Sequence, residues 1–302
     1  MMSSFWAVDA APLLVAILAA MNCALLGNYL LLRRHALLGD ALSHVVLPGL
    51  AVAFLLTGII SPLFMMLGAG AACLLAVLLM AALSRWGGLQ PSMAMGVVLT
   101  GMFALGVMLL EQQLGRQVHL DAQHALYGAL EMVYWPELQQ IQDLFHTETL
   151  LNMPRQLAML WLLLLGLGVL LLLLFKETRL ICFDPIFARV AGYQVGLWQL
   201  IFLGLLVLCL VAAFEAVGSI LVVGFLVCPP ATARLLTQNL AHQIILSSIL
   251  AAFSATLGYS LAILLPAWLG IEHAFVAAPM MVLVAGLLLF TACLWQRPQS
   301  LR

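Results

Sequence analysis

Two side chains with metal-ligand chemistry lie four residues apart near the first basic residues of the sequence. Asp40 and His44 stand in the run Gly39-Asp40-Ala41-Leu42-Ser43-His44, and in a helix this spacing places both side chains on one face. A carboxylate oxygen and an imidazole nitrogen are ligands that divalent transition metals accept. The pair is therefore a candidate metal site. The alternative is that Asp40 caps the helix or pairs with Arg33 or Arg34, while His44 is a hydrogen-bonded residue of a helix bundle.

The chain that positions this pair has the composition of a membrane protein. Of its 302 residues, 65% are hydrophobic and only 8% are charged, which is too little polar surface for a soluble protein of this size. Because lipid offers no hydrogen bonds, the membrane-spanning segments should all be helical. Long stretches without Asp, Glu, Lys or Arg cover residues 10–32, 41–84, 86–110, 156–175, 190–214, 216–233, 235–271 and 273–296.

These stretches predict an all-α integral membrane fold with eight to nine, and most simply nine, transmembrane helices. About 20 helical residues cross the hydrocarbon core, so the stretch 41–84 is long enough for two passes, with a break at Ser61-Pro62. The whole chain, 1–302, is expected to form a single polytopic domain. Its net charge of −1 leaves no basic face for nucleic acid, and its six cysteines stand singly, which argues against a disulfide framework.

The distribution of basic residues predicts the orientation, because positively charged loops stay on the cytoplasmic side. With the N-terminus outside and the C-terminus inside, nine of the eleven Lys and Arg residues fall inside. The outer side keeps Arg116, Arg155 and the segment 115–155. Apolar residues recur in that segment, which suggests short amphipathic helices on the outer surface with Tyr134 and Trp135 at the level of the lipid headgroups.

Two further places interrupt the apolar stretches. Glu215 separates two of them near the predicted outer surface, where a turn between helices explains it and a role in a pathway is the alternative. Cys228-Pro229-Pro230 closes the short stretch 216–233, and prolines remove backbone donors. We therefore expect a broken helix at Pro229 and Pro230. Broken membrane helices are tolerated where the freed groups are buried or face a cavity, which favours a transporter over a simple anchor.

The inner loop 176–197 is the most charged of the predicted cytoplasmic loops. Asp184 followed by Pro185 is typical of a helix start, and Gly192 is typical of a helix stop. About two helical turns between these signals would form either an ordinary connector or a docking element for a soluble partner. The chain has no ATPase motif of its own, since no Gly-x-x-x-x-Gly precedes its single lysine, Lys176. We therefore do not expect an enzyme.

Four segments resemble the permease subunits of bacterial ABC importers for zinc, manganese and iron, of the ZnuB or MntB type. The segment 33–49, which contains Asp40 and His44, looks like the family's signature around the second helix. Asp184 through Gly192 looks like its coupling segment, residues 217–234 are similar to its broken-helix segment, and Ala278-Pro279 fits the start of its last helix. The likeness covers nearly the whole chain.

This resemblance implies a type II ABC importer permease bundle with a cytoplasmic coupling helix, in the bacterial cytoplasmic (inner) membrane. Asp40 and His44 would line the metal pathway, and Asp184, Ala188 and Gly192 would contact the ATPase. Separate ATPase subunits would bind the ATP, a periplasmic or lipoprotein metal-binding protein would deliver the metal, and a second permease copy or a paralogue would complete the pathway among membrane lipid. The cargo would be manganese, zinc or iron, with no permanently bound cofactor.

The outer segment departs from the family's pattern. An aromatic-Gly-Asp or aromatic-Gly-Asn run is usual there, whereas this chain has Tyr127-Gly128-Ala129, so Glu131 is the candidate replacement. Together with Glu131, the outer residues His119, Asp121 and His124 are possible contacts for metal or for the binding protein, with a solvated loop as the alternative. Two other functions stay open at this point: a permease for a metal chelate such as a siderophore or cobalamin, and a secondary carrier.

Overall fold

Every element that the structure describes is a helix, as lipid requires of a membrane-spanning chain. The computed structural model describes residues 8–33, 38–58, 62–109, 130–136, 152–270 and 275–296. The elements are α2 (Ala10–Leu32), α3 (Leu38–Thr57), α4 (Pro62–Trp86), α5 (Pro91–Leu109), the 3-10 turn η2 (Leu130–Met132), α8 (Arg155–Leu173), α9 (Phe175–Phe183), α10 (Pro185–Val190), α11 (Val195–Leu236), α12 (Leu240–Leu269) and α13 (Ala277–Gln296).

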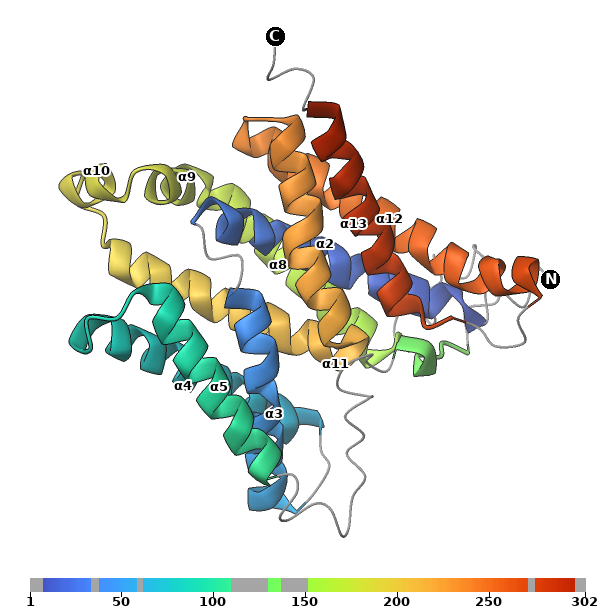
Figure 1. Cartoon of the computed structure of the whole chain (residues 1–302), viewed down its shortest axis with the longest axis horizontal. Coiled ribbons are helices and arrows are strands. Elements are labelled where there is room, and N and C mark those ends of the chain that lie inside the picture. Colours follow the sequence, from blue (N-terminus) through green and yellow to red (C-terminus); the bar gives the residue numbers. More distant parts are fainter. Residues whose placement is uncertain are drawn as a thin grey trace.

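The described helices confirm the predicted membrane architecture. Seven of them, α2, α4, α5, α8, α11, α12 and α13, are long and apolar enough to cross a bilayer. Helix α11 has 42 residues, or about 63 Å at 1.5 Å per residue, which is about twice the hydrocarbon thickness. It bends sharply, and its two halves run in different directions (Figure 1). Counting α3 and both halves of α11, the described chain offers the nine spans that the sequence predicts.

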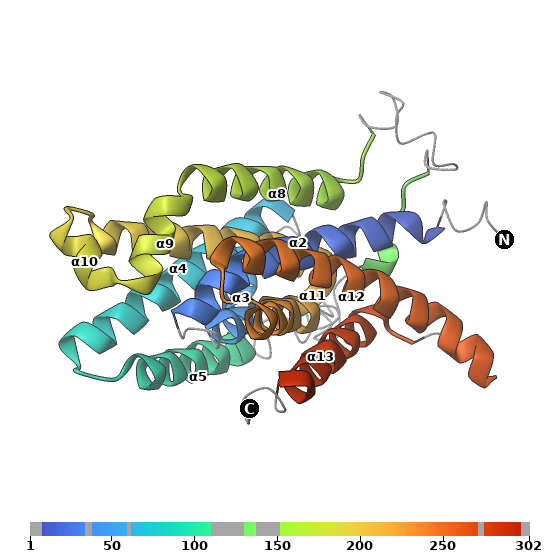
Figure 2. The ribbon, with the colours of Figure 1, turned by 90° about the horizontal axis from the view of Figure 1, so that it is seen from above.

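The helices pack as two groups around α11. Helix α2 runs through the middle of the molecule and packs against α8, α11 and α12, and α13 packs on α11 and α12, while α3, α4 and α5 pack mainly on one another (Figures 1 and 2). Helix α11 also contacts α3 and α4 and so joins the two groups. Small residues such as Ala16, Ala19, Ala20 and Ala24 are fully buried along α2, which lets neighbouring backbones approach closely.

The break predicted at Pro229 and Pro230 is wrong. Both prolines lie inside α11, whose backbone leaves helical geometry at Gly218 instead, with φ 78° and ψ 171°. Residues with a Cβ essentially never adopt this conformation. Proline 230 supplies no N–H to the Leu226 carbonyl, but that carbonyl oxygen lies against Gly27 of α2, where an added Cβ would clash with it. A neighbouring backbone therefore covers the oxygen that Pro230 leaves without its helical donor.

The described part of the outer segment also differs from its prediction. Trp135 is only 1% exposed and belongs to the main apolar core, together with Leu130 and Val133, whereas Tyr134 is exposed. Residues 130–136 therefore fold back onto the bundle, and Trp135 packs in the protein core instead of lying on an outer amphipathic helix. The rest of the segment, residues 110–129 and 137–151, lies outside the described residues.

The two ends of the molecule differ in charge. Helices α9 and α10 and the turn between α4 and α5 lie together at the left of Figure 1, and the start of α2 lies toward the opposite side. The α9–α10 end carries Lys176, Arg179 and Arg189, and α4 ends there with Arg85. This end is the one that the positive-inside rule assigns to the cytoplasm.

Candidate functional site

The proposed metal residues lie on α3, at the contact between the two helix groups. His44 is half-buried, and its ring meets the Phe103 ring of α5 edge to face, with 5.5 Å between ring centroids and 77° between planes. Asp40 lies one turn earlier in the same helix, and its side chain is outside the described part of the structure. Among the described residues, no group of three or more His, Cys, Asp or Glu side chains is placed to hold a metal ion.

Close backbone packing fixes α3 against its neighbours. A Cβ added at Gly39 would lie 2.5 Å from the Leu226 side chain of α11, and a Cβ at Gly106 of α5 would lie 2.8 Å from the ring of Pro48. Pro48 lies inside α3 and supplies no N–H to the His44 carbonyl, four residues earlier. The segment with Asp40 and His44 is therefore held between α5 and the part of α11 that contains Pro229 and Pro230.

A buried hydrogen-bonded network joins α2, α11 and α12 near the basic end of the molecule. The amide nitrogen of Asn28 donates to the Ser247 hydroxyl at 2.7 Å, and the amide nitrogen of Gln243 donates to Asn28 Oδ1 at 3.0 Å. Arg234 donates to Gln243 Oε1 at 3.4 Å and to the Gln238 carbonyl at 3.1 Å. Asn28, Gln243 and Ser247 are fully buried. The network therefore fixes the end of α11 to α2 and α12 where hydrogen bonds to water are excluded.

An ion pair lies at the opposite end, beside the bend of α11. Arg155, at the start of α8, lies 3.6 Å from Glu215, three residues before Gly218. Both side chains are partly exposed, so water screens the attraction. Arg155 also contacts the Met66 sulfur of α4 at 3.2 Å. Glu215 thus lies inside α11, three residues before the bend, and not in a turn between two separate helices.

The α9–α10 element has two well-formed helix caps. The Asp184 carboxylate accepts a hydrogen bond from the Phe187 N–H at 2.9 Å and caps the start of α10. At the other end Gly192 has φ 88°, and the N–H groups of Tyr193 and Gly192 donate to the carbonyls of Ala188 and Arg189 at 3.0 and 3.1 Å. This pair of bonds is a Schellman motif. The start and stop signals of the sequence therefore bound a real helix.

Helix α10 buries one side chain and exposes an apolar surface. Ala188 is fully buried against Ile181 of α9 and Val195 of α11. Ile186 is 74% exposed and Val190 is 82% exposed. Because α10 stands beside charged residues rather than within a long apolar span, its exposed side chains form a surface suited to a protein partner.

The remaining predicted residues belong to the outer segment. His119, Asp121 and His124 lie outside the described residues, and Glu131 lies in η2, with its side chain also outside the described part. Asn28, Gln243 and Ser247, and the pairing of Glu215 with Arg155, were not predicted from the sequence. The available signal was Asn28 within an otherwise apolar span and the spacing of Gln243 and Ser247 by one helical turn.

Comparison with known proteins establishes the family. The family model described as the ABC 3 transport family matches residues 8–296. The chain belongs to the ABC 3 transport family. It is a multi-pass membrane permease of an ABC transporter, without an ATPase of its own, which decides against the secondary carrier considered from the sequence.

Two relatives of this ABC 3 chain illustrate the range of the family. The chain is 38% identical over 259 residues to the manganese transport system membrane protein MntD of Bacillus subtilis (strain 168), covering 85% of this chain and 82% of MntD. It is 33% identical over 251 residues to the zinc transport system membrane protein TroD of Treponema pallidum (strain Nichols), covering 83% of this chain and 66% of TroD.

Solved structures of similar fold agree with this assignment. The structure of PsaBC from Streptococcus pneumoniae in complex with a Fab matches with a TM-score of 0.72 at 26% identity, over 93% of this chain and 89% of the other. A second structure, described as an inward-facing metal-chelate type ABC transporter, has a TM-score of 0.69 at 16% identity, over 96% and 87% of the two chains. The second likeness shows the fold alone.

Proposed function

We propose that this ABC 3 permease conducts a divalent transition metal into the cell, with manganese as the first candidate, zinc as the second and iron as the third. The observation that carries the proposal is the 38% identity over 85% of the chain to a manganese transport protein. The similarity to a zinc transport protein supports the same class of cargo. The carboxylate of Asp40 and the imidazole of His44 suit all three metals.

The pair Asp40 and His44 would bind the metal weakly as it passes. Conduction needs binding that is strong enough to replace part of the ion's hydration shell and weak enough to release it. One carboxylate and one imidazole from each of two permease copies would supply such a site. The half-buried position of His44 on α3, between α5 and α11, is compatible with a side chain that lines a path.

The energy for transport would come from separate ATPase subunits that bind α10. In this proposal Asp184 and Gly192 hold the ends of α10, Ala188 anchors its buried side, and Ile186 and Val190 contact the ATPase. ATP-driven closure of the ATPase subunits would then shift the bundle between inward-open and outward-open states.

The outer end would receive the metal from a binding protein. With the N-terminus outside and the C-terminus inside a bacterial inner membrane, the segment 115–155 would face that protein. Imidazole and carboxylate groups of this segment would contact the metal or the partner's surface. They belong to His119, Asp121, His124 and Glu131.

Metal uptake tests the pathway directly. A strain that lacks this permease would be complemented with the wild-type gene, with Asp40→Ala plus His44→Ala, or with His242→Ala, an exposed histidine of α12. Cellular manganese, zinc and iron would be measured by mass spectrometry after growth in metal-limited medium, with the permease quantified in isolated membranes.

We expect the double variant to lose most of the uptake of one metal, and the His242→Ala control to keep it. Unchanged uptake by a normally expressed double variant would exclude the ionic pathway and favour a chelate as cargo. The metal whose content falls identifies the substrate.

Copurification tests the coupling element. Val190→Glu places a charge on an 82% exposed apolar position, so the permease should fold but should no longer retain its ATPase through an affinity-tag purification. Met132→Glu, at a 71% exposed position near the other end of the molecule, is the matched control and should retain it. Equal ATPase recovery from both variants would show that α10 is not the contact.

A further inference from the structure

The imidazole of His44 packs against a phenylalanine ring of the neighbouring helix α5. The Phe103 ring meets it edge to face, with 5.5 Å between the ring centroids and 77° between the ring planes. Aromatic rings at this spacing and angle attract one another beyond the apolar area that they bury, because the positive edge of one ring faces the negative face of the other. The contact therefore favours one orientation of the imidazole.

The backbones of α3 and α5 hold the two rings at this distance. Pro48 lies about one helical turn after His44 on α3, and Gly106 lies about one turn after Phe103 on α5. A Cβ added at Gly106 would lie 2.8 Å from the Pro48 ring and 2.9 Å from its backbone nitrogen. The missing side chain of Gly106 therefore lets α5 approach α3 closely, one turn away from the ring contact.

The two rings are held together but are not enclosed on every side. Phe103 is 40% exposed, and His44 is half-buried. A side chain that is already held in one orientation loses less conformational freedom when it binds a ligand, and this smaller cost raises the affinity. An imidazole held by Phe103 would therefore bind an ion more tightly than an imidazole that turns freely.

We propose that Phe103 is a positioning residue for metal binding by His44. The proposal rests on the function proposed above, in which Asp40 and His44 are the ligands of the passing ion. Phe103 itself does not bind the ion; it acts through the imidazole, whose orientation it fixes in advance. Gly106 serves the same purpose, because it keeps α5 close to α3.

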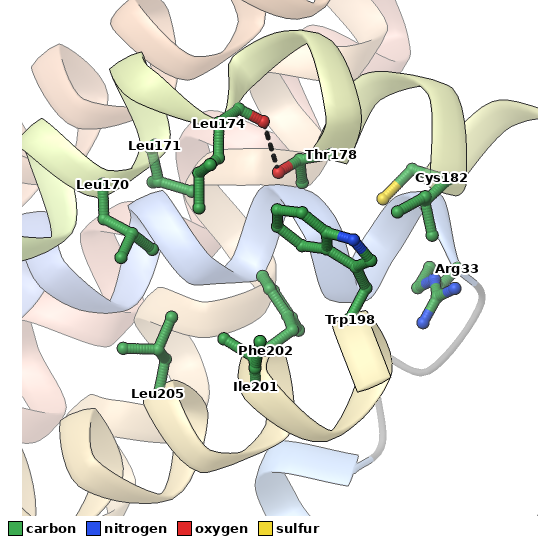
Figure 3. A pocket seen from close by; sticks show the side chains of 11 residues that line it. Arg33, Leu170, Leu171, Leu174, Thr178, Cys182, Trp198, Ile201, Phe202 and Leu205 are labelled. Carbon is green, nitrogen blue, oxygen red and sulfur yellow. Dashed lines mark hydrogen bonds between the residues drawn. The ribbon is translucent and has the colours of Figure 1, made fainter. Parts of the chain in front are cut away.

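A second aromatic pair of similar geometry provides a matched control. The Phe202 ring of α11 meets the Tyr29 ring of α2 with 5.3 Å between the ring centroids and 64° between the ring planes. Figure 3 shows Phe202 with Trp198 and Leu205 beside an apolar space between helices, whose described lining contains no residue of α3 or α5. Breaking this pair should disturb packing without reaching His44.

Manganese binding by the purified full-length permease in nanodiscs tests the proposal. Free Mn²⁺ would be counted from its electron paramagnetic resonance signal during a titration, without nucleotide and without a binding protein. Phe103→Leu removes the ring and keeps an apolar side chain, whereas Phe103→Tyr keeps the ring. Phe202→Leu is the control for lost packing, and His44→Ala removes the proposed ligand itself.

We expect Phe103→Leu to weaken Mn²⁺ binding about two- to tenfold, and Phe103→Tyr and Phe202→Leu to bind as the wild type does. In the His44→Ala background, Phe103→Leu should have no further effect, because it acts through the imidazole. A further loss in that background, or an equal loss in Phe103→Tyr or Phe202→Leu, would overturn the positioning role.

Two glycines of α5 test the role of the close backbone approach. Gly106→Ala should also weaken Mn²⁺ binding, because its Cβ would press α5 away from Pro48. Gly101→Ala should leave the binding unchanged, because a Cβ there meets no other atom within 4 Å. Equal binding by these two variants would contradict the role of Gly106.

The His44→Ala variant separates this proposal from the function on which it rests. If His44→Ala loses Mn²⁺ binding and Phe103→Leu keeps it, Phe103 is not a positioning residue, and the proposed pathway stands. If His44→Ala binds Mn²⁺ as the wild type does, His44 is not a ligand, and the proposed function fails together with the role of Phe103.

Discussion

The bend of α11 at Gly218 makes a quantitative prediction about stability. With φ 78° and ψ 171°, Gly218 occupies a region of backbone conformation that is closed to residues with a Cβ. Gly218→Ala should therefore destabilise the native bend by about 1–3 kcal/mol. The variant should favour a straighter helix, which would separate Arg155 from Glu215 beside the bend.

The same helix provides the matched control. Gly204 lies in the regular first half of α11, and a Cβ added there would meet no other atom within 4 Å. In a helix interior, alanine is more favourable than glycine by about 0.5–1 kcal/mol. Gly204→Ala should therefore stabilise the protein slightly, so the two alanine variants should differ by about 1.5–4 kcal/mol in their free energy of unfolding.

Unfolding in mixed micelles, titrated with a denaturing detergent and followed by circular dichroism and tryptophan fluorescence, measures this difference. Uptake of metal by cells that express each variant would show whether the bend is also needed for transport. Equal unfolding free energies for Gly218→Ala and Gly204→Ala would refute the argument, because they would show that position 218 does not require glycine.

Two further predictions concern buried groups. Gln243→Leu should lower the free energy of unfolding by about 1–2 kcal/mol, because it leaves Asn28 Oδ1 without its donor. Adding Asn28→Leu should restore most of that loss. A double variant as unstable as the sum of the two single variants would contradict the pairing. Burial raises the pKa of the Cys182 thiol, and the Arg33 guanidinium opposes that rise. Arg33→Gln should therefore raise the pKa of Cys182 further and leave less of its thiolate at pH 8. Alkylation of Cys182, measured by peptide mass spectrometry, should then slow severalfold while the exposed Cys293 reacts unchanged; an equal or faster rate at Cys182 would disprove the electrostatic coupling.

The sequence predicted features that depend on local rules. Charge-free length alone gives the number of spans, because the hydrocarbon thickness fixes how many helical residues are needed. The caps of α10 were equally predictable, since Asp184 and Gly192 act through backbone groups only a few residues away. Both features need no knowledge of what the segment packs against.

Features that depend on packing between distant segments were not predictable in the same way. The two prolines, Pro229 and Pro230, predicted a helix break, because the sequence does not show that Gly27 lies against the Leu226 carbonyl. The sequence alone does not distinguish Gly218 from the other glycines, because its backbone angles appear only in the folded chain. The burial of Trp135 could not be predicted from the sequence, because it depends on how residues 130–136 fold onto α2.

The double capping of α10 bears on the contact that we propose between this helix and an ATPase subunit. A free segment of six residues would hardly populate a helix in water, and a partner that bound it would have to order it first. Here the Asp184 cap, the Gly192 turn and the buried Ala188 hold the shape in advance. If the proposed ATPase contact displaced α10, the movement would therefore reach α9 and α11 with the helix intact.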